Sequence, residues 1–218
     1  QVRAITNIFK GRTGTDIAVH FSLDEGCDVT LLTSNPPDTP GWGDWSPSPH
    51  VVTYRTYQEL HDKMKELITT ENYDVIIHSS AVSDYEVTGM FYKQDGTLYE
   101  IDHSGKVGSD YDELYMKLTP TKKLIDLIRP EWGFKGILVK FKLQVGISDQ
   151  ELLGIALKSM KTSEADFIVA NCLEWHNKYA YIIGKDGDPL YVERKELAGK
   201  LYEEVNGVYR ESGAGSNG

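Results

Sequence analysis

The sequence predicts an α/β fold of three layers, with helices on both faces of a mostly parallel central sheet and a β-hairpin near the C-terminus. Two observations predict it. Short apolar runs typical of buried strands alternate along the chain with amphipathic helical segments. The last two apolar runs, 179–184 and 190–192, flank the turn Lys185–Asp188, and this arrangement indicates a hairpin.

Each element follows from its own local pattern. Thr56 precedes a helical stripe over 57–70 and predicts a capped helix there. The segments 35–49 and 88–112 are expected to be irregular: the first is rich in proline, and the second is polar, either disordered or a functional flap. The other expected strands are 28–33, 51–54, 74–78, 115–118, 136–143 and 166–171, and the other expected helices are 15–23, 119–128, 148–162 and 195–204.

Composition limits the classes of protein that fit. The 218 residues carry a net charge of −10, which argues against a nucleic-acid partner. The two cysteines have no metal-like spacing, so we expect a reducing compartment. No apolar run approaches the roughly 20 residues that span a bilayer, and no signal peptide is recognisable. We therefore expect a cytoplasmic protein without a membrane partner, with one domain over 1–205 and a flexible tail over 206–218.

A short glycine loop near the start of the chain is the first candidate site. Gly11 and Gly14 lead directly into the first expected helix. A glycine turn that opens a helix presents backbone N–H groups and the positive end of the helix dipole, which together favour an anion such as phosphate. An ordinary loop before a surface helix remains the alternative. Such a loop normally follows a β-strand, so we expect that this strand is either missing from the printed sequence or supplied from elsewhere.

The second candidate site follows the apolar run that begins at Asp74. Small polar residues, 79–85, come directly after this run. In open α/β sheets ligands bind beyond the carboxyl ends of the strands, so this segment is a site candidate by topology. His78 is either a metal ligand or a histidine of the core, and no other ligand residue lies at a useful spacing.

Four segments then occur in a characteristic order: residues 2–14 with Asn7 and both glycines, 81–85 (AVSDY), 141–143 (FKL) and 165–171 (ADFIVAN). Together they resemble phosphopantothenoylcysteine synthetase, the phosphopantothenate–cysteine ligase of coenzyme A biosynthesis. The resemblance covers about residues 2–205 and implies a modified Rossmann-like fold. Residues 105–109 (GKVGS) also resemble the flexible, lysine-bearing flap of that family.

The resemblance implies a ligase that joins 4′-phosphopantothenate to cysteine. A nucleoside triphosphate, CTP or ATP, activates the carboxylate as an acyl-nucleotide and releases pyrophosphate. The cysteine amine then displaces the nucleoside monophosphate. Positioning and charge neutralisation dominate such chemistry, and Mg²⁺ would arrive mostly with the nucleotide rather than at a protein metal site. The family also implies a homodimer whose flap reaches a neighbouring site.

The resemblance assigns roles to individual residues. Asn7 would engage the acyl intermediate, or else cap its loop, and Lys106 would fold over the phosphates; these two are the catalytic candidates. Asp84 would hydrogen-bond the nucleotide or cap a turn, and Phe141 would contact the base or belong to the core. The nucleotide-binding candidates are Ser80, Ala81, Asp84, Lys106 and Phe141. The substrate- and phosphate-binding candidates are Lys10, Gly11, Gly14 and Asn171.

Departures from the family pattern keep alternatives open. Phe9 and Lys10 stand where hydroxyl residues are typical, so hydroxyl donors are lost and a cation is gained. Lys140 replaces a common glycine, and residues 144–145 (QV) replace a frequent Glu-Thr pair. The alternatives are a relative that activates another carboxylate and a non-catalytic module that binds a nucleotide or phosphopantetheine. An NAD(P)-dependent oxidoreductase ranks below both, because the strict G-x-G-x-x-G loop is absent.

Overall fold

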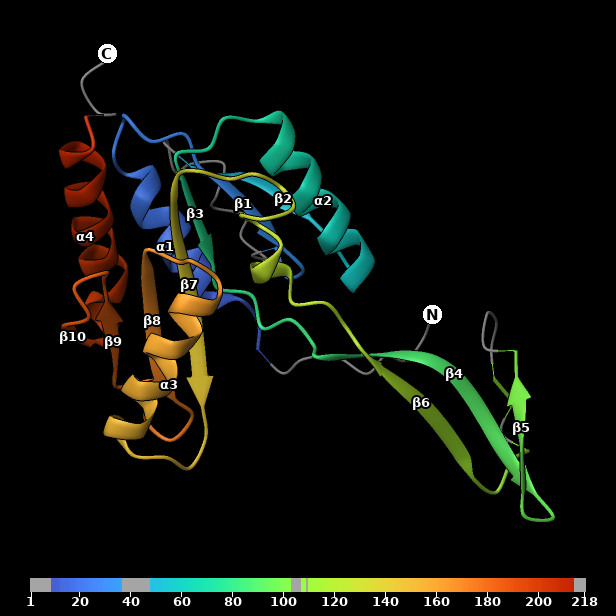
Figure 1. Ribbon diagram of the computed structural model, residues 1–218. Helices are drawn as coiled ribbons and strands as arrows, with labels where there is room; N and C mark the ends of the chain where they lie inside the picture. Colours follow the sequence, from blue (N-terminus) through green and yellow to red (C-terminus); the bar gives the residue numbers. More distant parts are fainter. Residues whose placement is uncertain (1–8, 37–47, 103–106, 109, 214–218) are drawn as a thin grey trace. The chain divides into compact units, whose positions relative to one another are not determined.

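The computed structural model describes residues 9–36, 48–102, 107–108 and 110–213 (Figure 1). They fall into two compact units, which we treat separately. The main unit holds residues 9–80 and 125–213, and the three-stranded unit holds the described residues of 81–124. In the part of the chain that the structure describes, no helix is long and apolar enough to cross a membrane.

The main unit is built on a five-stranded sheet in the order β10-β9-β8-β7-β3. Of these five strands, β3, β7 and β8 run parallel to one another, and β9 and β10 continue the sheet as an antiparallel hairpin. They are β3 (Val75–His78), β7 (Ile137–Gln144), β8 (Phe167–Cys172), β9 (Tyr179–Ile183) and β10 (Pro189–Glu193). A separate parallel pair consists of β1 (Thr30–Thr33) and β2 (His50–Thr53). The predicted α/β fold with a C-terminal hairpin is confirmed.

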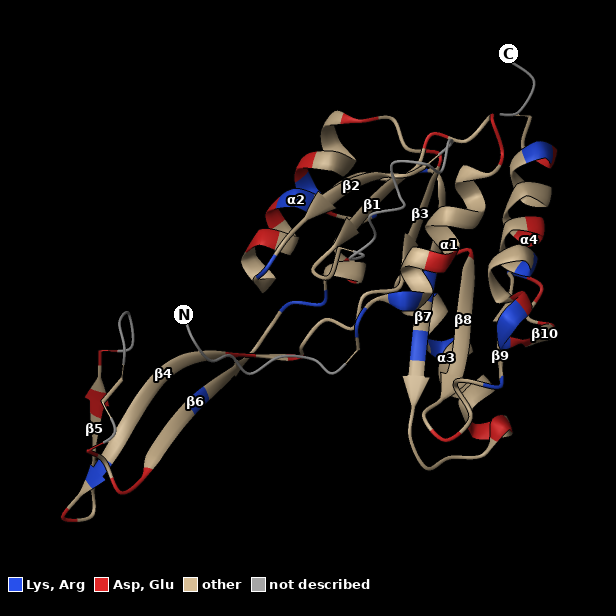
Figure 2. Ribbon diagram, turned by 180° about the vertical axis from the view of Figure 1, so that it is seen from behind, with Lys and Arg blue, Asp and Glu red and all other residues tan. Residues whose placement is uncertain are grey.

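Helices cover both faces of this sheet (Figures 1 and 2). On one face, α1 (Arg12–Ser22) and α4 (Leu197–Glu211) share a core with the sheet, formed mainly by Ile17, Phe21, Val139, Phe167, Val169, Ile182, Leu201 and Val205. On the other face, α3 (Asp149–Thr162) lies over β7 and β8. The remaining helix, α2 (Tyr57–Thr70), buries Leu60 and Met64.

Two helices begin where their local sequence predicts. The Thr56 side chain accepts a hydrogen bond of 3.1 Å from the backbone N–H of Glu59, which fixes the start of α2. Ser148 and Glu151 form a reciprocal capping box at the start of α3, with bonds of 2.9 and 3.3 Å. Both helices match their expected ranges because the signals that define them are local.

Other boundaries differ from the sequence predictions. The helix expected over 119–128 is wrong: β6 (Leu114–Pro120) continues through the Thr-Pro pair, and only a short 3₁₀ turn (Leu124–Asp126) follows. Pro120 was taken as an N-terminal helix residue, but it ends an edge strand, which proline also tolerates. Helix α4 continues past the expected end at Glu204 to Glu211. The division into a domain over 1–205 and a tail over 206–218 stays a prediction.

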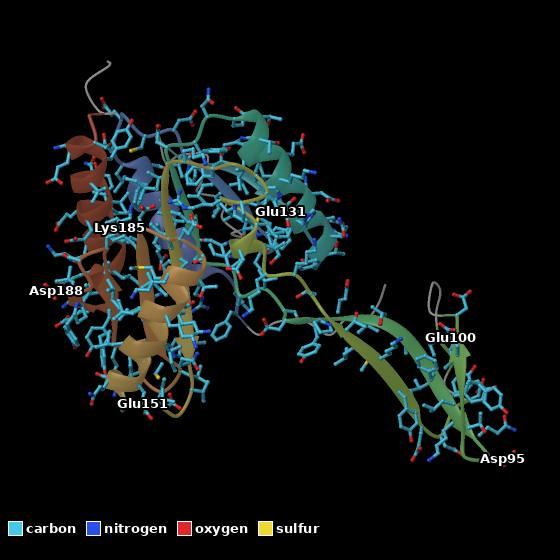
Figure 3. The ribbon with its side chains drawn as sticks, in the orientation of Figure 1. Asp95, Glu100, Glu131, Glu151, Lys185 and Asp188 are labelled. Atoms are coloured by element: carbon cyan, nitrogen blue, oxygen red, sulfur yellow. The ribbon has the colours of Figure 1, made fainter. Side chains whose placement is uncertain are left out.

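The three-stranded unit is an antiparallel sheet in the order β5-β4-β6. A tight turn at Asp95 and Gly96 joins β4 (Tyr85–Gln94) to β5 (Thr97–Ile101), and Figure 3 labels Asp95 at this turn. Both turn residues have positive φ, 49° and 82°, as a two-residue hairpin turn requires. The prediction of an irregular segment over 88–112 is therefore wrong for residues 88–101. Its polar composition hid the alternation, although the Asp-Gly pair signalled a hairpin.

Both cysteines are free. Cys172 is buried at the end of β8, where its thiol lies 3.7 Å from the carbonyl oxygen of Ile147. Burial raises the pKa of this thiol above its ordinary value. Burial, assisted by the nearby charge of Asp24, also raises the pKa of Cys27.

Candidate functional site

The glycine loop forms the N-terminus of α1. Gly11 is the N-cap residue, and its φ of 72° lies in the left-handed region that favours glycine. Its carbonyl oxygen accepts the first helical bond, 3.0 Å from the backbone nitrogen of Thr15. Gly11 provides no side-chain cap, and the first turn holds no acidic residue. The open N–H groups and the helix dipole therefore suit an external anion.

Gly14 brings this turn against the end of β3. A Cβ atom added at Gly14 would come within 2.8 Å of the Ser79 hydroxyl oxygen, closer than real Cβ contacts allow. The absence of a side chain thus lets the first turn of α1 approach Ser79, which directly precedes Ser80. The glycine loop and Ser79, the first residue after β3, lie together, as the topology of an α/β sheet predicts.

Phe141 and Asn171 lie on the face of the sheet that α1 covers. Phe141 packs against the core shared by α1 and α4, so its side chain is partly in the core. Val169 belongs to the same core, and Asn171, two residues further along β8, has the same orientation. Asn171 pairs with Leu143 near the carboxyl ends of both strands. The side-chain amide of Asn171, at the end of β8, and the glycine loop therefore lie at the same edge and on the same face of the sheet.

Lys140 points to the opposite face and is a structural residue. Its buried ammonium group donates to the carbonyl oxygen of Ser159 at 3.0 Å and to the hydroxyl of Ser163 at 2.8 Å. These acceptors lie at the C-terminus of α3, where the helix dipole favours a cation. The lysine that departs from the family pattern thus fastens α3 to the sheet, away from the glycine loop.

His78 is paired with Lys140 across β3 and β7. Desolvation, followed by the charge of Lys140, lowers the pKa of His78 from 6.5 to about 4. The imidazole is therefore neutral at physiological pH. Among the described residues there is no group of three or more His, Cys, Asp or Glu side chains that could hold a metal. The interpretation of His78 as a core histidine stays a prediction.

Two contacts at the loop were not predicted from the sequence. Arg194, in the 3₁₀ turn Arg194–Glu196 before α4, donates to the hydroxyl of Thr13 in the first turn of α1. Burial lowers the pKa of this guanidinium, and Asp16 partly counters the effect. Phe9 meets His176 edge to face, with ring centroids 6.4 Å apart. Both pairs join residues remote in sequence, so no local pattern could reveal them.

The remaining candidates belong to the three-stranded unit or lie outside the described residues. Asp84 is exposed, and its carbonyl oxygen accepts from the backbone nitrogen of Thr121 at 3.0 Å. The Thr121 hydroxyl also donates to the carbonyl oxygen of Ser83 at 2.6 Å, so two bonds close the base of this unit. Ala81 begins the unit. Asn7 and Lys106 are outside the described residues, and their roles stay predictions, while Lys10 is described and exposed.

The fold and these residues define an α/β domain with a glycine loop at the carboxyl edge of a mainly parallel sheet. The chain belongs to the family described as the DNA/pantothenate metabolism flavoprotein C-terminal domain, which matches residues 1–206. The resemblance found in the sequence is confirmed at the level of the family.

Known proteins similar to this chain support the same grouping. It is 29% identical over 213 residues to the coenzyme A biosynthesis bifunctional protein CoaBC of Thermococcus kodakarensis, covering 94% of this chain and 47% of that protein. The CoaBC protein of Methanocaldococcus jannaschii is 27% identical, with 94% and 46% covered. The chain thus spans about half the length of these curated relatives.

Solved structures agree on the fold. The DNA/pantothenate metabolism flavoprotein of Streptococcus pneumoniae matches with a TM-score of 0.75 and 27% identity, over 95% of this chain and 93% of that one. A Cab2 variant in complex with phosphopantothenate-cysteine matches with a TM-score of 0.69 and 16% identity, over 100% and 83% of the two chains. The second likeness concerns the fold alone.

Proposed function

We propose that this chain is a phosphopantothenate–cysteine ligase, which activates 4′-phosphopantothenate with a nucleoside triphosphate and transfers the acyl group to cysteine. The observation that carries the proposal is the uncapped N-terminus of α1 beside Ser79, with Asn171 on the same face. This arrangement offers N–H donors and positive potential to an anionic substrate. Membership of the family and the names of the CoaBC relatives support the same activity.

In this proposal, a small number of groups would carry out the ligase reaction. The backbone at Gly11 and the exposed Lys10 would hold anionic oxygens, and Asn171 would orient the substrate by hydrogen bonding. Asp84 and Phe141 would contact the nucleotide, while Asn7 would act in the amine step and Lys106 would cover the phosphates. Mg²⁺ bound to the triphosphate would neutralise charge on its phosphates.

A pyrophosphate assay tests this function. The protein is incubated with Mg²⁺, 4′-phosphopantothenate, cysteine and either CTP or ATP. Pyrophosphate release that requires phosphopantothenate is expected, and the more active nucleotide identifies the natural one. If neither nucleotide gives release but one still raises the melting temperature, a non-catalytic binding module replaces the proposal. Release with a different carboxylate would identify a relative of changed specificity.

We also propose that the protein works as a homodimer formed through the three-stranded unit, in the cytoplasm. The residue pairing places eight apolar side chains on one face of this sheet: Val87, Met90, Tyr92, Tyr99, Ile101, Leu114, Met116 and Leu118. Five of these are at least 40% exposed. The opposite face carries three charged side chains, Lys93, Glu100 and Lys117, together with Phe91, Leu98 and Tyr115.

A second copy is the occupant that suits this face. An uncharged apolar sheet face is self-complementary, as a two-fold interface requires. Within the unit itself, the described side chains provide very little to cover it, because Leu124 is the only buried large apolar residue among the described residues of this unit. Three strands with one uncovered apolar face gain stability when that face is buried.

A further inference from the structure

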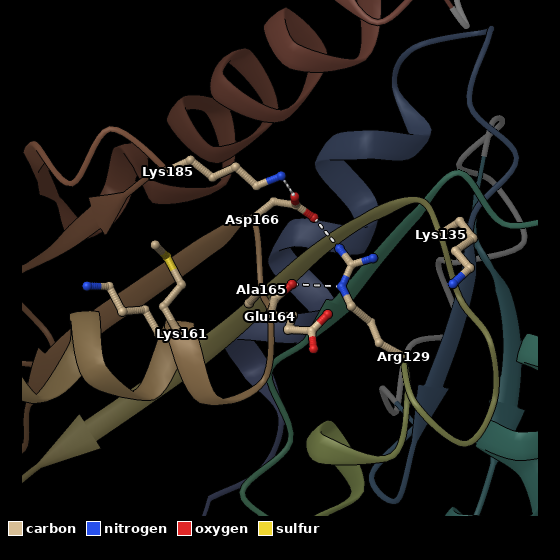
Figure 4. Close-up of a pocket in the computed structure, with 8 residues that line it drawn as sticks. Arg129, Lys135, Lys161, Glu164, Ala165, Asp166 and Lys185 are labelled. Atoms are coloured by element: carbon tan, nitrogen blue, oxygen red, sulfur yellow. Dashed lines mark hydrogen bonds and ion pairs between the residues drawn. The ribbon is translucent and has the colours of Figure 1, made fainter.

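A cavity lies at the amino edge of the main sheet, at the opposite end of the strands from the glycine loop. Its volume is about 460 Å³, within the usual range for small-molecule sites. Lys135 lies just before β7 and Asp166 just before β8, so the cavity is at the end of these strands opposite to the candidate site. Figure 4 shows its lining, which is Arg129, Lys135, Met160, Lys161, Glu164, Ala165, Asp166 and Lys185.

The carboxylate of Asp166 is already neutralised in this cavity. One oxygen lies 2.7 Å from the Arg129 guanidinium and also accepts the backbone N–H of Leu138 at 2.7 Å. The other oxygen lies 2.5 Å from the ammonium nitrogen of Lys185. Because three of its roughly four acceptor positions are used, two of them by cations, Asp166 presents little free negative charge to a ligand.

Arg129 is held rigidly and keeps limited donor capacity. Its guanidinium also donates to the carbonyl oxygens of Glu164 at 2.7 Å, Gly136 at 3.1 Å and Phe134 at 3.3 Å. With the bond to Asp166, these use four of its five N–H groups. The guanidinium is therefore a fixed cation at the centre of the cavity, as Figure 4 shows.

The lining has more positive than negative charge. Its four cationic side chains face two carboxylates, which leaves a surplus of two charges. The whole chain, in contrast, has a net charge of −10. Lys135 and Lys161 are exposed, and no ion pair engages either of them within the described ranges. A local cationic surface on an acidic protein attracts small anions by its focused potential.

We propose that this cavity is a second anion site, which binds a phosphate group independently of the glycine loop. A phosphomonoester carries about −1.5 to −2 charges at pH 7, which matches the surplus of the lining. The bound phosphate would link Lys135, before β7, to Lys185, after β9, so it would stiffen this edge of the sheet. The site takes a small phosphorylated molecule or free phosphate.

The experiment titrates inorganic phosphate into the full chain by calorimetry, at constant ionic strength maintained with chloride. The variant K135Q/K161Q removes the two unpaired lysines, and K158Q is the control, because Lys158 is exposed on the same helix but does not line the cavity. A second titration of each protein uses adenosine 5′-monophosphate and distinguishes phosphate alone from an organic phosphate.

We expect the affinity for phosphate at one class of binding site to fall at least tenfold in K135Q/K161Q. K158Q should bind phosphate like the unaltered protein. Lys10→Gln, at the glycine loop, should leave this class unchanged. Equal affinity in K135Q/K161Q and the unaltered protein would overturn the proposal, as would an equal loss in K158Q. Ligase activity should survive in K135Q/K161Q, and binding is measured without turnover, so failure of this site and failure of the ligase function are distinct results.

Discussion

At the scale of single residues, Gly14 has a specific structural role in the candidate site. Its missing side chain lets the first turn of α1 approach the Ser79 hydroxyl. Gly154, in the middle of α3, is also helical, but an added Cβ there would meet nothing within 4 Å. The two glycines therefore form a matched pair, one required by packing and one not.

We predict opposite outcomes for these glycines. Gly154→Ala should stabilise the protein by about 0.5–1 kcal/mol, because alanine favours a helix. Gly14→Ala should shift the loop from Ser79 and lower kcat/KM roughly tenfold or more, because small displacements at a site have large effects. Urea denaturation and the pyrophosphate assay measure the two effects. Full activity in Gly14→Ala would remove the close approach from the mechanism.

His78 predicts how stability depends on pH. Its pKa is lowered to about 4 in the folded protein, against 6.5 for the free side chain. Between these values the unfolded chain binds a proton that the native state does not, so stability falls as the pH is lowered through this window. Each pKa unit corresponds to about 1.4 kcal/mol, so the loss is roughly 3 kcal/mol by pH 4.

Denaturation curves at several pH values between 7 and 4 test this. His78→Gln should flatten the dependence over that window, while His50→Gln, at an exposed edge position, serves as the matched histidine control. An unchanged slope in His78→Gln would show that other groups cause the dependence.

At the scale of elements, local signals were predictable and distant contacts were not. The ranges of α2 and α3 followed from Thr56 and Ser148, whose caps lie within a few residues. The helix expected after Thr119 failed because proline is compatible with both a helix start and a strand end. The bonds of Arg194 to Thr13 and of Asp166 to Arg129 join distant segments, and no periodicity encodes such pairs.

Asp166 connects three elements and is expected to be important for stability. It links the start of β7 through Leu138, the preceding loop through Arg129 and the β9–β10 turn through Lys185. Asp166→Asn leaves the half-buried Arg129 guanidinium without its counter-charge, so we expect a loss of stability on the order of 2 kcal/mol. Urea denaturation measures it, and Asp188→Asn in the same turn is the control. A loss below about 1 kcal/mol would contradict this role.

At the scale of the whole molecule, the sequence predicted the main sheet better than the three-stranded unit. The parallel strands are buried on both faces and stand out as apolar runs. The strands β4 to β6 alternate apolar and polar residues, and their apolar side is exposed in one chain. Such an alternation within a polar segment is difficult to recognise in a single sequence.

The association of two chains can be tested on one strand. Met116→Lys places a charge on the apolar face of β6, and Tyr115→Lys places the same charge on the opposite face. We expect light scattering to show that Met116→Lys is monomeric and that Tyr115→Lys remains dimeric, because burial of an unpaired charge is costly. If the unaltered protein is monomeric at micromolar concentration, the interface is wrong.

The two cysteines have a consequence for an enzyme that is proposed to use free cysteine. Thiol–disulfide exchange requires a thiolate, and burial keeps the pKa of both Cys27 and Cys172 raised, so both thiols remain protonated. A protonated thiol is a poor nucleophile, so neither Cys27 nor Cys172 would form a mixed disulfide with the oxidised form of the cysteine substrate. The protein can work in a pool of small thiols and disulfides without becoming covalently modified by its own substrate.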